Sequence, residues 1–465
     1  MILDRRSFLT GLGAGLVLAQ LPRVASAAPT VTGFDPHVLV HIALDGTTTI
    51  FCHRSEMGQG IRSSLPVLIG DEIGADPARV VVVQADGDKK YGDQNTDGST
   101  SIRKQYDYLR QAGATARMML TAAAAKRWKV KPETCTTANH QVIHSASKRT
   151  LAFADVVADA AKLPVPKKVT YRPFSELVNV TSENLPLIDG EAHVTGTSHY
   201  GADIRLPNML TAMIARPPVV GGKLVTYDAT AANRVPGVKR IVEMPQPKPP
   251  WLFQPWGGVA VIADTTWAAM KGRAALKLEW DHGANATYDS IAYREQLLGS
   301  VRADGTKARE VGDIDKAFSA AKKTVEAEYV VPHLSHMQME PLVAVAHMHD
   351  GICEVWAPTQ NPQENRTDVA KLLGISEDKV TIHVTLLGGA FGRKSKSDFV
   401  VEAAYLASQL EGTPVRVQWT REDDVKHGYY NAVNAQRLRA ALDEYEYRDG
   451  LASPHSVHAD RGHVR

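Results

Sequence analysis

A glycine-rich loop set between a strand pattern and a helix pattern constrains this chain more than any other feature. In "KVTIHVTLL", Val380, Ile382 and Val384 alternate on one face, which predicts a strand. "SDFVVEAAYLASQLEG" has the periodicity of an amphipathic helix closed by Gly412 and Pro414. The segment between them, "GGAFGRK", therefore lies on a strand-to-helix turn. Backbone N–H groups and a helix N-terminus can bind an anion at such a turn.

Two observations limit what this loop can bind. Gly388, Gly389 and Gly392 permit close backbone approach, and Arg393 and Lys394 add positive charge. However, a P-loop needs lysine directly after its second glycine, and the Gly-x-Gly-x-x-Gly dinucleotide fingerprint is absent. Taken alone, the loop is either an anion site of another kind or a tight turn with two solvated cations.

Length, charge and cysteine content exclude several classes of protein. The chain has 465 residues, too many for one core, so two or three domains are expected. A net charge of +2 without a basic segment gives no case for a nucleic-acid partner. Cys52, Cys135 and Cys353 are too far apart in sequence for a zinc ribbon or an iron–sulfur cluster of their own. We expect buried or loop thiols, so any metal centre for electron transfer must lie on another chain.

Strand and helix patterns alternate along the chain. A hairpin is predicted over 40–51, then a helix in "SSLPVLIGDEIGA", a strand in "ARVVVVQAD" and a long helix ending near Trp128. Prolines at 163–169 mark a linker, residues 196–280 are strand-rich with one helix at 265–272, and 281–314 form a polar connection. The pattern predicts an α+β to α/β architecture of about three units, with no membrane-spanning segment after the N-terminus.

The first 27 residues have the pattern of an export signal. Arg5 and Arg6 precede a short apolar stretch, and Ala25-Ser26-Ala27 has the small-x-small form of a cleavage site. An uncleaved anchor helix is the alternative, but the stretch is short and interrupted by glycines. Twin-arginine signals export folded proteins, so we expect a periplasmic protein that acquires a bulky cofactor before export.

A second glycine loop lies far upstream, where Gly58-Gln59-Gly60 stands between the predicted hairpin and helix. Together with "GGAFGRK" it resembles the large, molybdenum-cofactor-binding subunits of the xanthine dehydrogenase family. The resemblance is greatest to the bacterial branch of isoquinoline 1-oxidoreductase β subunits and membrane-bound aldehyde dehydrogenases. It extends to about Asp443 and includes "GADIRLPNML", "HMQMEPLVAVAH" and "APTQNPQENR".

The resemblance implies a role for each matching position. The implied cofactor-binding residues are Gly58, Gln59, Gly60, Gly98, Ser99, Thr100, Ser101, Gln360, Gly388, Gly389, Ala390, Phe391, Gly392 and Arg393. His336, Gln338 and Glu340 would lie near the substrate pocket, with a plain strand as the alternative. Molybdenum receives no protein side-chain ligand in this family, so a missing cluster of histidines and cysteines does not argue against the resemblance.

The resemblance also implies domains, cofactor and partners. It divides the chain into an N-terminal molybdopterin-binding region (28–165), a β-rich, hammerhead-like middle domain (166–290) and a molybdopterin-binding domain (291–443). The implied cofactor is molybdopterin in its cytosine dinucleotide form with molybdenum; a pyrroloquinoline quinone is the alternative. The implied partners are a small 2Fe–2S subunit and a cytochrome c acceptor.

The implied reaction inserts oxygen from water into an aldehyde or N-heteroaromatic C–H bond of a small-molecule substrate. Ser395 stands where purine-oxidising members carry a glutamate, which disfavours purines. The general-base glutamate of the family is not found in this chain, so its catalytic residues stay unknown. Residues 444–465 show no apolar period and are predicted to be coil. A truncated, inactive subunit is therefore a further alternative.

Four histidines raise the question of a zinc site. His347 and His349 alternate along a predicted strand, and His333 and His336 precede it. Alternating strand spacing without a partner cysteine favours an ordinary strand over zinc binding.

Overall fold

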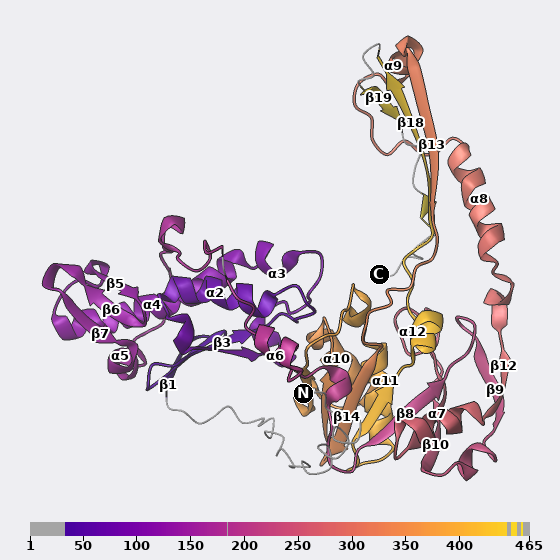
Figure 1. Cartoon of the computed structure of the whole chain (residues 1–465), viewed down its shortest axis with the longest axis horizontal. Helices are drawn as coiled ribbons and strands as arrows, with labels where there is room; N and C mark the ends of the chain where they lie inside the picture. The colour runs from indigo at the N-terminus through magenta and orange to yellow at the C-terminus, as the bar shows by residue number, and fades with distance from the viewer. Residues whose placement is uncertain (1–32, 184, 444–447, 453–456, 459–465) are drawn as a thin grey trace, which may run out of the picture.

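The computed structural model describes residues 33–183, 185–443, 448–452 and 457–458. Figure 1 shows three parts: an N-terminal lobe, a central sheet with its helices, and a long arm. The predicted signal peptide, residues 1–27, lies outside the described residues.

The N-terminal lobe is built on a four-stranded sheet covered by helices. The strands, in spatial order, are β1 (Gly33–His37), β2 (Val40–Ala43), β3 (Thr48–Cys52) and β4 (Val80–Gln84). The helices that pack against it are α2 (Ile61–Ile73), α4 (Tyr106–Trp128) and α5 (Phe153–Ala160). A small sheet of β5 (Cys135–Ala138), β6 (Gln141–His144) and β7 (Arg149–Ala152) completes the lobe. The predicted hairpin, both helices and the following strand are confirmed.

The central sheet has seven strands and is covered on both faces. Its strands, in spatial order, are β10 (Val238–Met244), β11 (Gly258–Ala263), β8 (Leu210–Ala215), β17 (Val415–Gln418), β14 (Val343–His349), β15 (Ile352–Ala357) and β16 (Val380–Val384). Ile214 belongs to the core beneath α10 (Pro362–Leu373) and α11 (Asp398–Ser408). Its neighbour Met213 packs toward α7 (Thr266–Ala274) on the other face. Burial of both faces explains the continuous apolar runs in these strands.

Strands on both sides of the predicted boundary at residue 290 share this sheet. β8, β10 and β11 precede the boundary, whereas β14 to β17 follow it. A separate two-stranded ribbon of β9 (Lys223–Asp228) and β12 (Lys277–Asp281) accompanies them. The division into domains stays a prediction.

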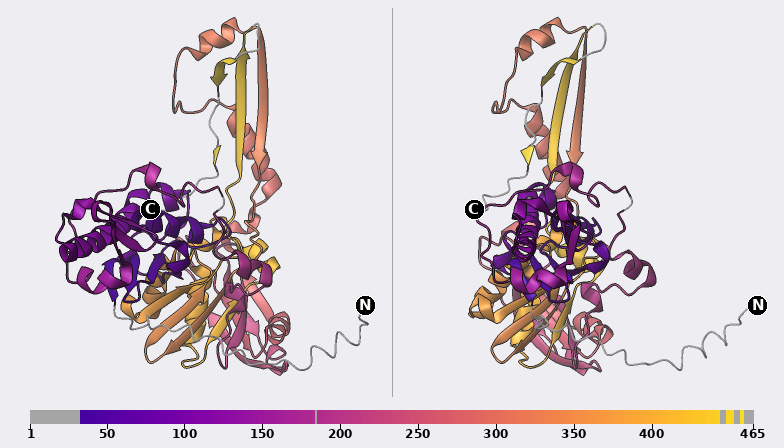
Figure 2. Two further views of the ribbon diagram at one scale, coloured as in Figure 1. Left: turned by 60° about the vertical axis from the view of Figure 1, so that its left-hand side comes forward. Right: turned by 90° about the vertical axis from the view of Figure 1, so that its left-hand side faces the viewer.

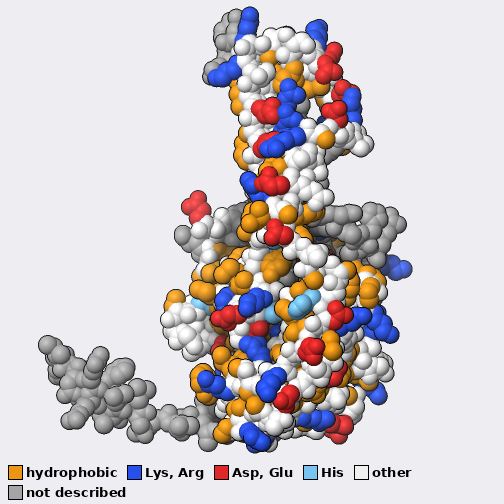
Figure 3. Space-filling model, turned by 90° about the vertical axis from the view of Figure 1, so that its right-hand side faces the viewer, with side chains coloured by type: hydrophobic (Ala, Val, Ile, Leu, Met, Phe, Trp, Pro, Cys, Tyr) orange, Lys and Arg blue, Asp and Glu red, His pale blue; other side chains and the backbone are white. Residues whose placement is uncertain are grey.

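The arm is an antiparallel ribbon that projects away from the other two parts (Figure 2). It comprises β13 (Lys323–Val331), β18 (Asn434–Leu442), β19 (Arg448–Ala452), β20 (Val457–His458), α8 (Ser290–Arg302) and α9 (Ile314–Ala320). Basic and acidic side chains are intermixed on the surface of the arm (Figure 3). Two ion pairs of the arm are Arg302–Glu328 and Arg437–Glu326.

Two sequence predictions about the arm differ from the structure. Residues 444–465 were expected to be coil, but the described segments 448–452 and 457–458 form β19 and β20, which both pair antiparallel with β18 and take their backbone partners from it. The rest of this range, 444–447, 453–456 and 459–465, lies outside the described residues. Residues 281–314 were expected to be a polar connection, but they contain α8. Asp289 caps this helix by accepting from the backbone N–H of Ile291 and Ala292, and only Leu297, Leu298 and Val301 are buried.

None of the described helices combines the length and apolarity needed to cross a bilayer. All three cysteines are free and buried, as expected of buried thiols.

Candidate functional site

Three loops from distant parts of the sequence meet between the N-terminal lobe and the central sheet. They are residues 55–60, which precede α2, residues 96–101, which lead into the short helix α3 (Thr100–Arg103) ahead of α4, and residues 386–394, between β16 and α11. Leu387 donates its N–H to the carbonyl of Glu56 at 2.9 Å. Ser55 donates its N–H to Oγ1 of Thr96 at 2.9 Å. The two predicted glycine loops are therefore neighbours in space.

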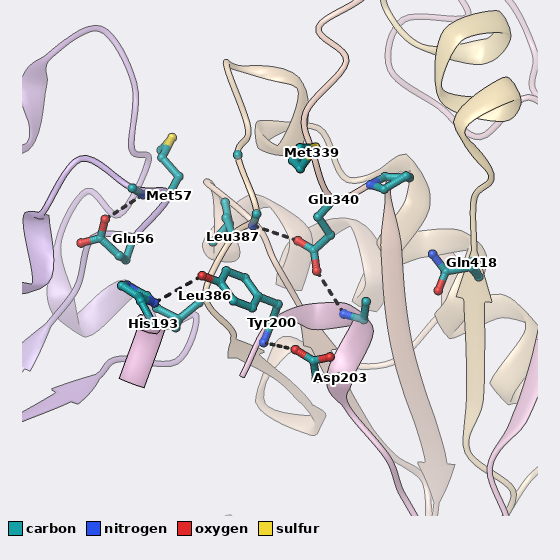
Figure 4. A pocket seen from close by; sticks show the side chains of 15 residues that line it. Glu56, Met57, His193, Tyr200, Asp203, Met339, Glu340, Leu386, Leu387 and Gln418 are labelled. Carbon is teal, nitrogen blue, oxygen red and sulfur yellow. Dashed lines mark hydrogen bonds between the residues drawn. The ribbon is translucent and has the colours of Figure 1, made fainter. Parts of the chain in front are cut away.

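Two cavities lie along these loops and share Met57. The first has a volume of about 580 Å³ and is lined by Glu56, Met57, Gly58, His193, Tyr200, Ala202, Asp203, Met339, Glu340, Pro341, Leu386, Leu387, Gly388, Gly389 and Gln418 (Figure 4). The second has a volume of about 380 Å³ and is lined by Met57, Gln59, Ile61, Ser64, Thr96, Asp97, Gly98, Ser99, Ser101, Ile102 and Gln360.

The predicted site residues divide into three groups. Gly58, Glu340, Gly388 and Gly389 line the first cavity. Those lining the second are Gln59, Gly98, Ser99, Ser101 and Gln360. Eight others are not among the lining residues of either cavity: Gly60, Thr100, His336, Gln338, Ala390, Phe391, Gly392 and Arg393.

The carboxylate of Glu56 accepts from backbone N–H groups of the first glycine loop and of the start of α2. Its Oε1 accepts from the N–H groups of Gly58 at 2.8 Å and Gly60 at 3.0 Å, and its Oε2 accepts from Arg62 at 3.0 Å. Gly58 and Gly60 have φ of 104° and 79°, the left-handed conformation that turns these groups toward one acceptor. The start of α2 therefore already holds a carboxylate of the protein itself.

Glu340 accepts hydrogen bonds from the second glycine loop, as Glu56 does from the first. Its carboxylate accepts from Gly388 N at 3.1 Å, from Ala202 N at 3.0 Å and from Nζ of Lys394 at 2.6 Å. A Cβ on Gly388 would lie 2.5 Å from the Cβ of Glu340, so only glycine fits this approach. A buried ion pair between Lys394 and Glu340 therefore holds the loop against the segment that precedes β14.

The structure corrects the expectation that Arg393 and Lys394 offer free charge to an anion. Arg393 is buried and donates to both carboxylate oxygens of Asp398, at 2.8 and 2.6 Å. Lys394 is equally buried and bound to Glu340. Both cations compensate carboxylates of their own chain, because buried charges require partners. Phe391, at φ 53°, is 70% exposed.

Gln360 connects the lobe to the sheet. Its Nε2 donates to the carbonyl of Thr96 at 2.7 Å, and its Oε1 accepts from Gly392 N at 3.0 Å. Its backbone carbonyl accepts from Thr96 N at 2.9 Å. Gln59 instead serves its own loop, since its amide bonds the Ser55 carbonyl and the Met57 N–H.

The second cavity presents unused hydroxyl groups. Gly98 and Ser99 have φ of 51° and 57°. Thr100 donates its hydroxyl to the carbonyl of Asp97 at 2.7 Å. Within the described part of the chain, the hydroxyls of Ser99 and Ser101 have no hydrogen-bond partner, so this cavity offers donors to a ligand.

Only part of the "HMQME" segment reaches a cavity. Glu340 and Met339 line the first cavity, whereas Gln338 is fully buried and donates to Oδ1 of Asp424 at 2.8 Å. His336 is half-buried away from the cavity lining, and burial, reinforced by the charge of Arg393, lowers its pKa. His336 and Gln338 therefore line neither cavity, with Met337 between them at φ 45°. Their assignment to the substrate pocket stays a prediction.

Four further polar residues of the first cavity were not predicted from the sequence: His193, Tyr200, Asp203 and Gln418. Tyr200 pairs with Leu386 in an isolated parallel bridge, which brings its segment beside the second glycine loop. Its hydroxyl lies 3.3 Å from Nδ1 of His193 (Figure 4). The neighbouring "GADIRLPNML" was part of the family resemblance and was the available signal for this segment.

The two segments of the chain that line these cavities match a known family. Residues 5–203 and 300–445 each match a family described as "Molybdopterin cofactor-binding domain". Together these segments contain all three loops that line the cavities. The chain belongs to the molybdopterin cofactor-binding family, whose two models together match most of its length. This membership and the mixed α+β fold were both predicted from the sequence and are confirmed.

Two relatives show how much of a related protein this chain spans. The chain is 32% identical over 464 residues to the membrane-bound aldehyde dehydrogenase (pyrroloquinoline-quinone) of Gluconacetobacter polyoxogenes, covering 95% of this chain and 58% of the relative. It is 30% identical over 514 residues to isoquinoline 1-oxidoreductase subunit beta of Brevundimonas diminuta, covering 98% of this chain and 64% of the relative. The chain thus spans less than two thirds of either relative's length.

A solved structure, that of quinoline 2-oxidoreductase from Pseudomonas putida 86, is also similar to this chain. The two align with a TM-score of 0.45 at 20% identity, over 57% of this chain and 38% of the other.

Proposed function

We propose that this chain forms part of the molybdopterin-binding subunit of an enzyme that oxidises an aldehyde or N-heteroaromatic C–H bond with oxygen derived from water. The observation that carries the proposal is the pair of adjoining cavities at Met57. Their walls come from both segments that match the molybdopterin cofactor-binding family. An extended ligand in contact with both cavities would touch most of the residues that the resemblance implies.

The chemical character of the two cavities fits the two ends of such a cofactor. A Cβ added to Gly58 would meet no atom within 4 Å, and one on Gly98 would meet only the Thr100 methyl at 3.7 Å, so both glycines face open space. Glu56, Asp203 and Glu340 make the first cavity unfavourable for a phosphate. The hydroxyls of Ser99 and Ser101 favour the second cavity for the phosphate or dinucleotide end. We propose the cytosine dinucleotide form.

The first cavity then holds the substrate beside the cofactor's reactive end. When bound, molybdenum supplies a centre that accepts two electrons from the substrate. The Tyr200 hydroxyl and His193 offer hydrogen bonds to a small polar substrate, and Met339 and Leu386 offer apolar contact. Glu56 and Glu340 are not proposed as general base, since each already accepts three hydrogen bonds from its own chain.

Electron transfer requires a partner in this proposal. All three thiols are buried in separate places and cannot ligate a cluster together. We propose a 2Fe–2S subunit as the first acceptor and a cytochrome c as the next. We also propose export to the periplasm through Arg5 and Arg6. Replacing both arginines with lysine should retain the protein in the cytoplasm, as cell fractionation would reveal.

The decisive experiment is metal and pterin analysis of the folded chain, co-produced with its iron–sulfur subunit in cells that make molybdopterin. We expect molybdenum and pterin in near-equal amounts. Replacing Ser99 and Ser101 together with alanine should reduce both contents, whereas Ser319→Ala on α9 in the arm should not. A folded sample that contains neither molybdenum nor pterin would contradict the proposal.

A pyrroloquinoline quinone is the second candidate cofactor, favoured only by the name of the Gluconacetobacter relative. The absorption spectrum of the extracted cofactor separates a quinone from a pterin. An inactive, cofactor-free subunit is the remaining alternative, and the same metal analysis excludes or supports it.

A further inference from the structure

The hairpin of β14 and β15 gathers two histidines and a glutamate at the surface. In the antiparallel register His347 lies directly opposite Glu354. His349 follows two residues after His347 and so projects from the same face. One ligand atom from each of these three residues lies within 4.8 Å of the others, and all three residues are half-buried.

The hairpin turn holds this arrangement in place. Asp350 and Gly351 have φ of 50° and 72°, which is the conformation of a tight two-residue turn that matches the twist of the strands. The imidazole rings of His347 and His349 have centroids 4.6 Å apart. The ligand atoms are therefore positioned by backbone geometry rather than by flexible loops.

Hydrogen bonds around the cluster orient its members as they do around a bound metal. Oε1 of Glu354 lies 3.2 Å from Nε2 of His383 on β16, which leaves Oε2 directed toward His349. Nδ1 of His349 lies 3.4 Å from Oδ2 of Asp350. An outer carboxylate on one imidazole nitrogen fixes the tautomer that presents the other nitrogen to a metal ion.

His347 has no role in this local network. Within the described part of the chain its ring nitrogens have no hydrogen-bond partner, although its ring packs on His349. Among the described residues, the ligand atoms that come together are those of His347, His349 and Glu354, without His333 or His336. Nε2 of His333 instead lies 2.9 Å from the hydroxyl of Tyr288. Glu354 thus supplies the third ligand that sequence spacing could not show.

We propose that His347, His349 and Glu354 bind one divalent transition-metal ion of the zinc class, separate from the molybdopterin site. Two imidazole nitrogens and one carboxylate oxygen suit Zn²⁺, Co²⁺ or Ni²⁺, whereas Mg²⁺ and Ca²⁺ prefer oxygen ligands throughout. Three protein ligands leave the remaining positions to water. The ion would join β14 to β15, and through Glu354 and His383 would extend to Asp86 in the N-terminal lobe.

The test is calorimetric titration of ZnCl₂ into the full chain after removal of metals with EDTA. The tail contains His455, His458 and His463, so a chain with these three replaced by alanine is titrated in parallel. We expect one Zn²⁺ per chain in both. His347→Ala and, as a variant of similar polarity, His347→Gln should each weaken binding about tenfold or more. His282→Ala, at an exposed histidine outside the cluster, is the matched control and should bind as the wild type does.

A second readout separates binding from loss of fold. Co²⁺ should give visible absorption bands with the wild type that His347→Gln abolishes, while the circular dichroism of the two metal-free proteins stays the same. Zinc binding that survives both His347 variants, or that disappears when only the tail histidines are replaced, would overturn the proposal. The outcome is independent of molybdenum content, because the titration does not require the loaded cofactor.

Discussion

At the scale of single residues, the second glycine loop depends on the ion pair between Lys394 and Glu340. The Lys394 side chain is fully buried and that of Glu340 is 9% exposed. Burial lowers the pKa of Lys394 despite the opposing charge of Glu340, so the pair sits in a costly environment. Each member satisfies the charge of the other, and Glu340 also accepts hydrogen bonds from the backbone N–H groups of Gly388 and Ala202.

Lys394→Met should therefore destabilise the protein by about 3–5 kcal/mol, since it leaves a buried carboxylate without its cation. Urea unfolding monitored by circular dichroism measures the effect. Adding Glu340→Gln to the first substitution should restore part of the loss. Lys379→Met, at an exposed lysine, should change the unfolding free energy by less than about 0.5 kcal/mol. Equal stability of the Lys394 and Lys379 variants would refute the role of the pair.

The cysteines permit a second prediction at this scale. Burial raises the pKa of the Cys52 and Cys353 thiols to about 12, and the thiolate is the reactive form. At about pH 8 both should react with a disulfide reagent more than roughly a thousandfold more slowly than a free cysteine. In denaturant, Cys52, Cys135 and Cys353 should all react quickly. Rapid labelling of Cys52 or Cys353 in the folded protein, located by mass spectrometry, would contradict their burial.

At the scale of elements, sequence patterns predicted those helices and strands whose periodicity reflects their packing. The strand before residue 386 and helix α11 were found because β16 alternates and α11 buries a wide apolar face. Helix α8 was missed because only Leu297, Leu298 and Val301 are buried, so most of its positions are exposed and its apolar period is short. β19 was missed because its partner, β18, determines its conformation.

The same physical limit applies to the candidate site. The glycines of both loops were identified because glycine itself is visible in a sequence. Their acceptors were not: Glu56 and Glu340 fill the N–H groups that were expected to face a ligand, and Glu340 lies 48 positions from Gly388. The charges of Arg393 and Lys394 were visible, but the carboxylates that compensate them could be assigned only from the fold.

Strand β16 also carries a pH-dependent connection between the lobe and the sheet. Burial of His383 opposes its charged form, but hydrogen bonds and attraction from Asp86 and Glu354 outweigh burial and raise its pKa above 6.5. Burial likewise opposes ionisation of Glu354, yet its bonds to His349 and His383 lower its pKa below 4.5. The His383 contribution is present below its unfolded pKa and is lost as pH rises through the folded value. The Glu354 contribution is present above its unfolded pKa and is lost as pH falls through the folded value.

His383→Gln should therefore destabilise the protein most at a pH above the folded pKa of Glu354 and below the folded pKa of His383. We expect a loss of about 1–3 kcal/mol near pH 6, which shrinks as pH rises through the folded pKa of His383. Thermal and urea unfolding across this range in EDTA buffer measure the difference without interference from a bound metal. His282→Gln supplies the control at an exposed position. If the difference in unfolding free energy between the wild type and His383→Gln grew as pH rises, then protonated His383 would not be the form that binds Asp86 and Glu354.

At the scale of the whole molecule, the N-terminal lobe and the central sheet are joined where the cavities lie. Gln360 is central to this junction because it bonds Thr96 in the lobe and Gly392 in the second glycine loop. His383 and Asp86 connect the same two parts at the edge strand β16, where the N–H of Gly87 also donates to the carbonyl of Ile382 at 3.0 Å. A change in the relative position of the two parts would alter both cavities together.

Gln360→Ala tests this coupling directly. The substitution leaves the Thr96 carbonyl and the Gly392 N–H without their partners, and each buried unsatisfied group costs about 1–3 kcal/mol. In protein prepared without molybdopterin, amides of both loops, 96–101 and 386–394, should exchange hydrogen for deuterium faster than in the wild type. Amides in the arm should be unaffected, and Gln141→Ala on the exposed side of β6 should change neither loop. Faster exchange in only one loop would mean that Gln360 belongs to that loop alone and does not couple the lobe to the sheet.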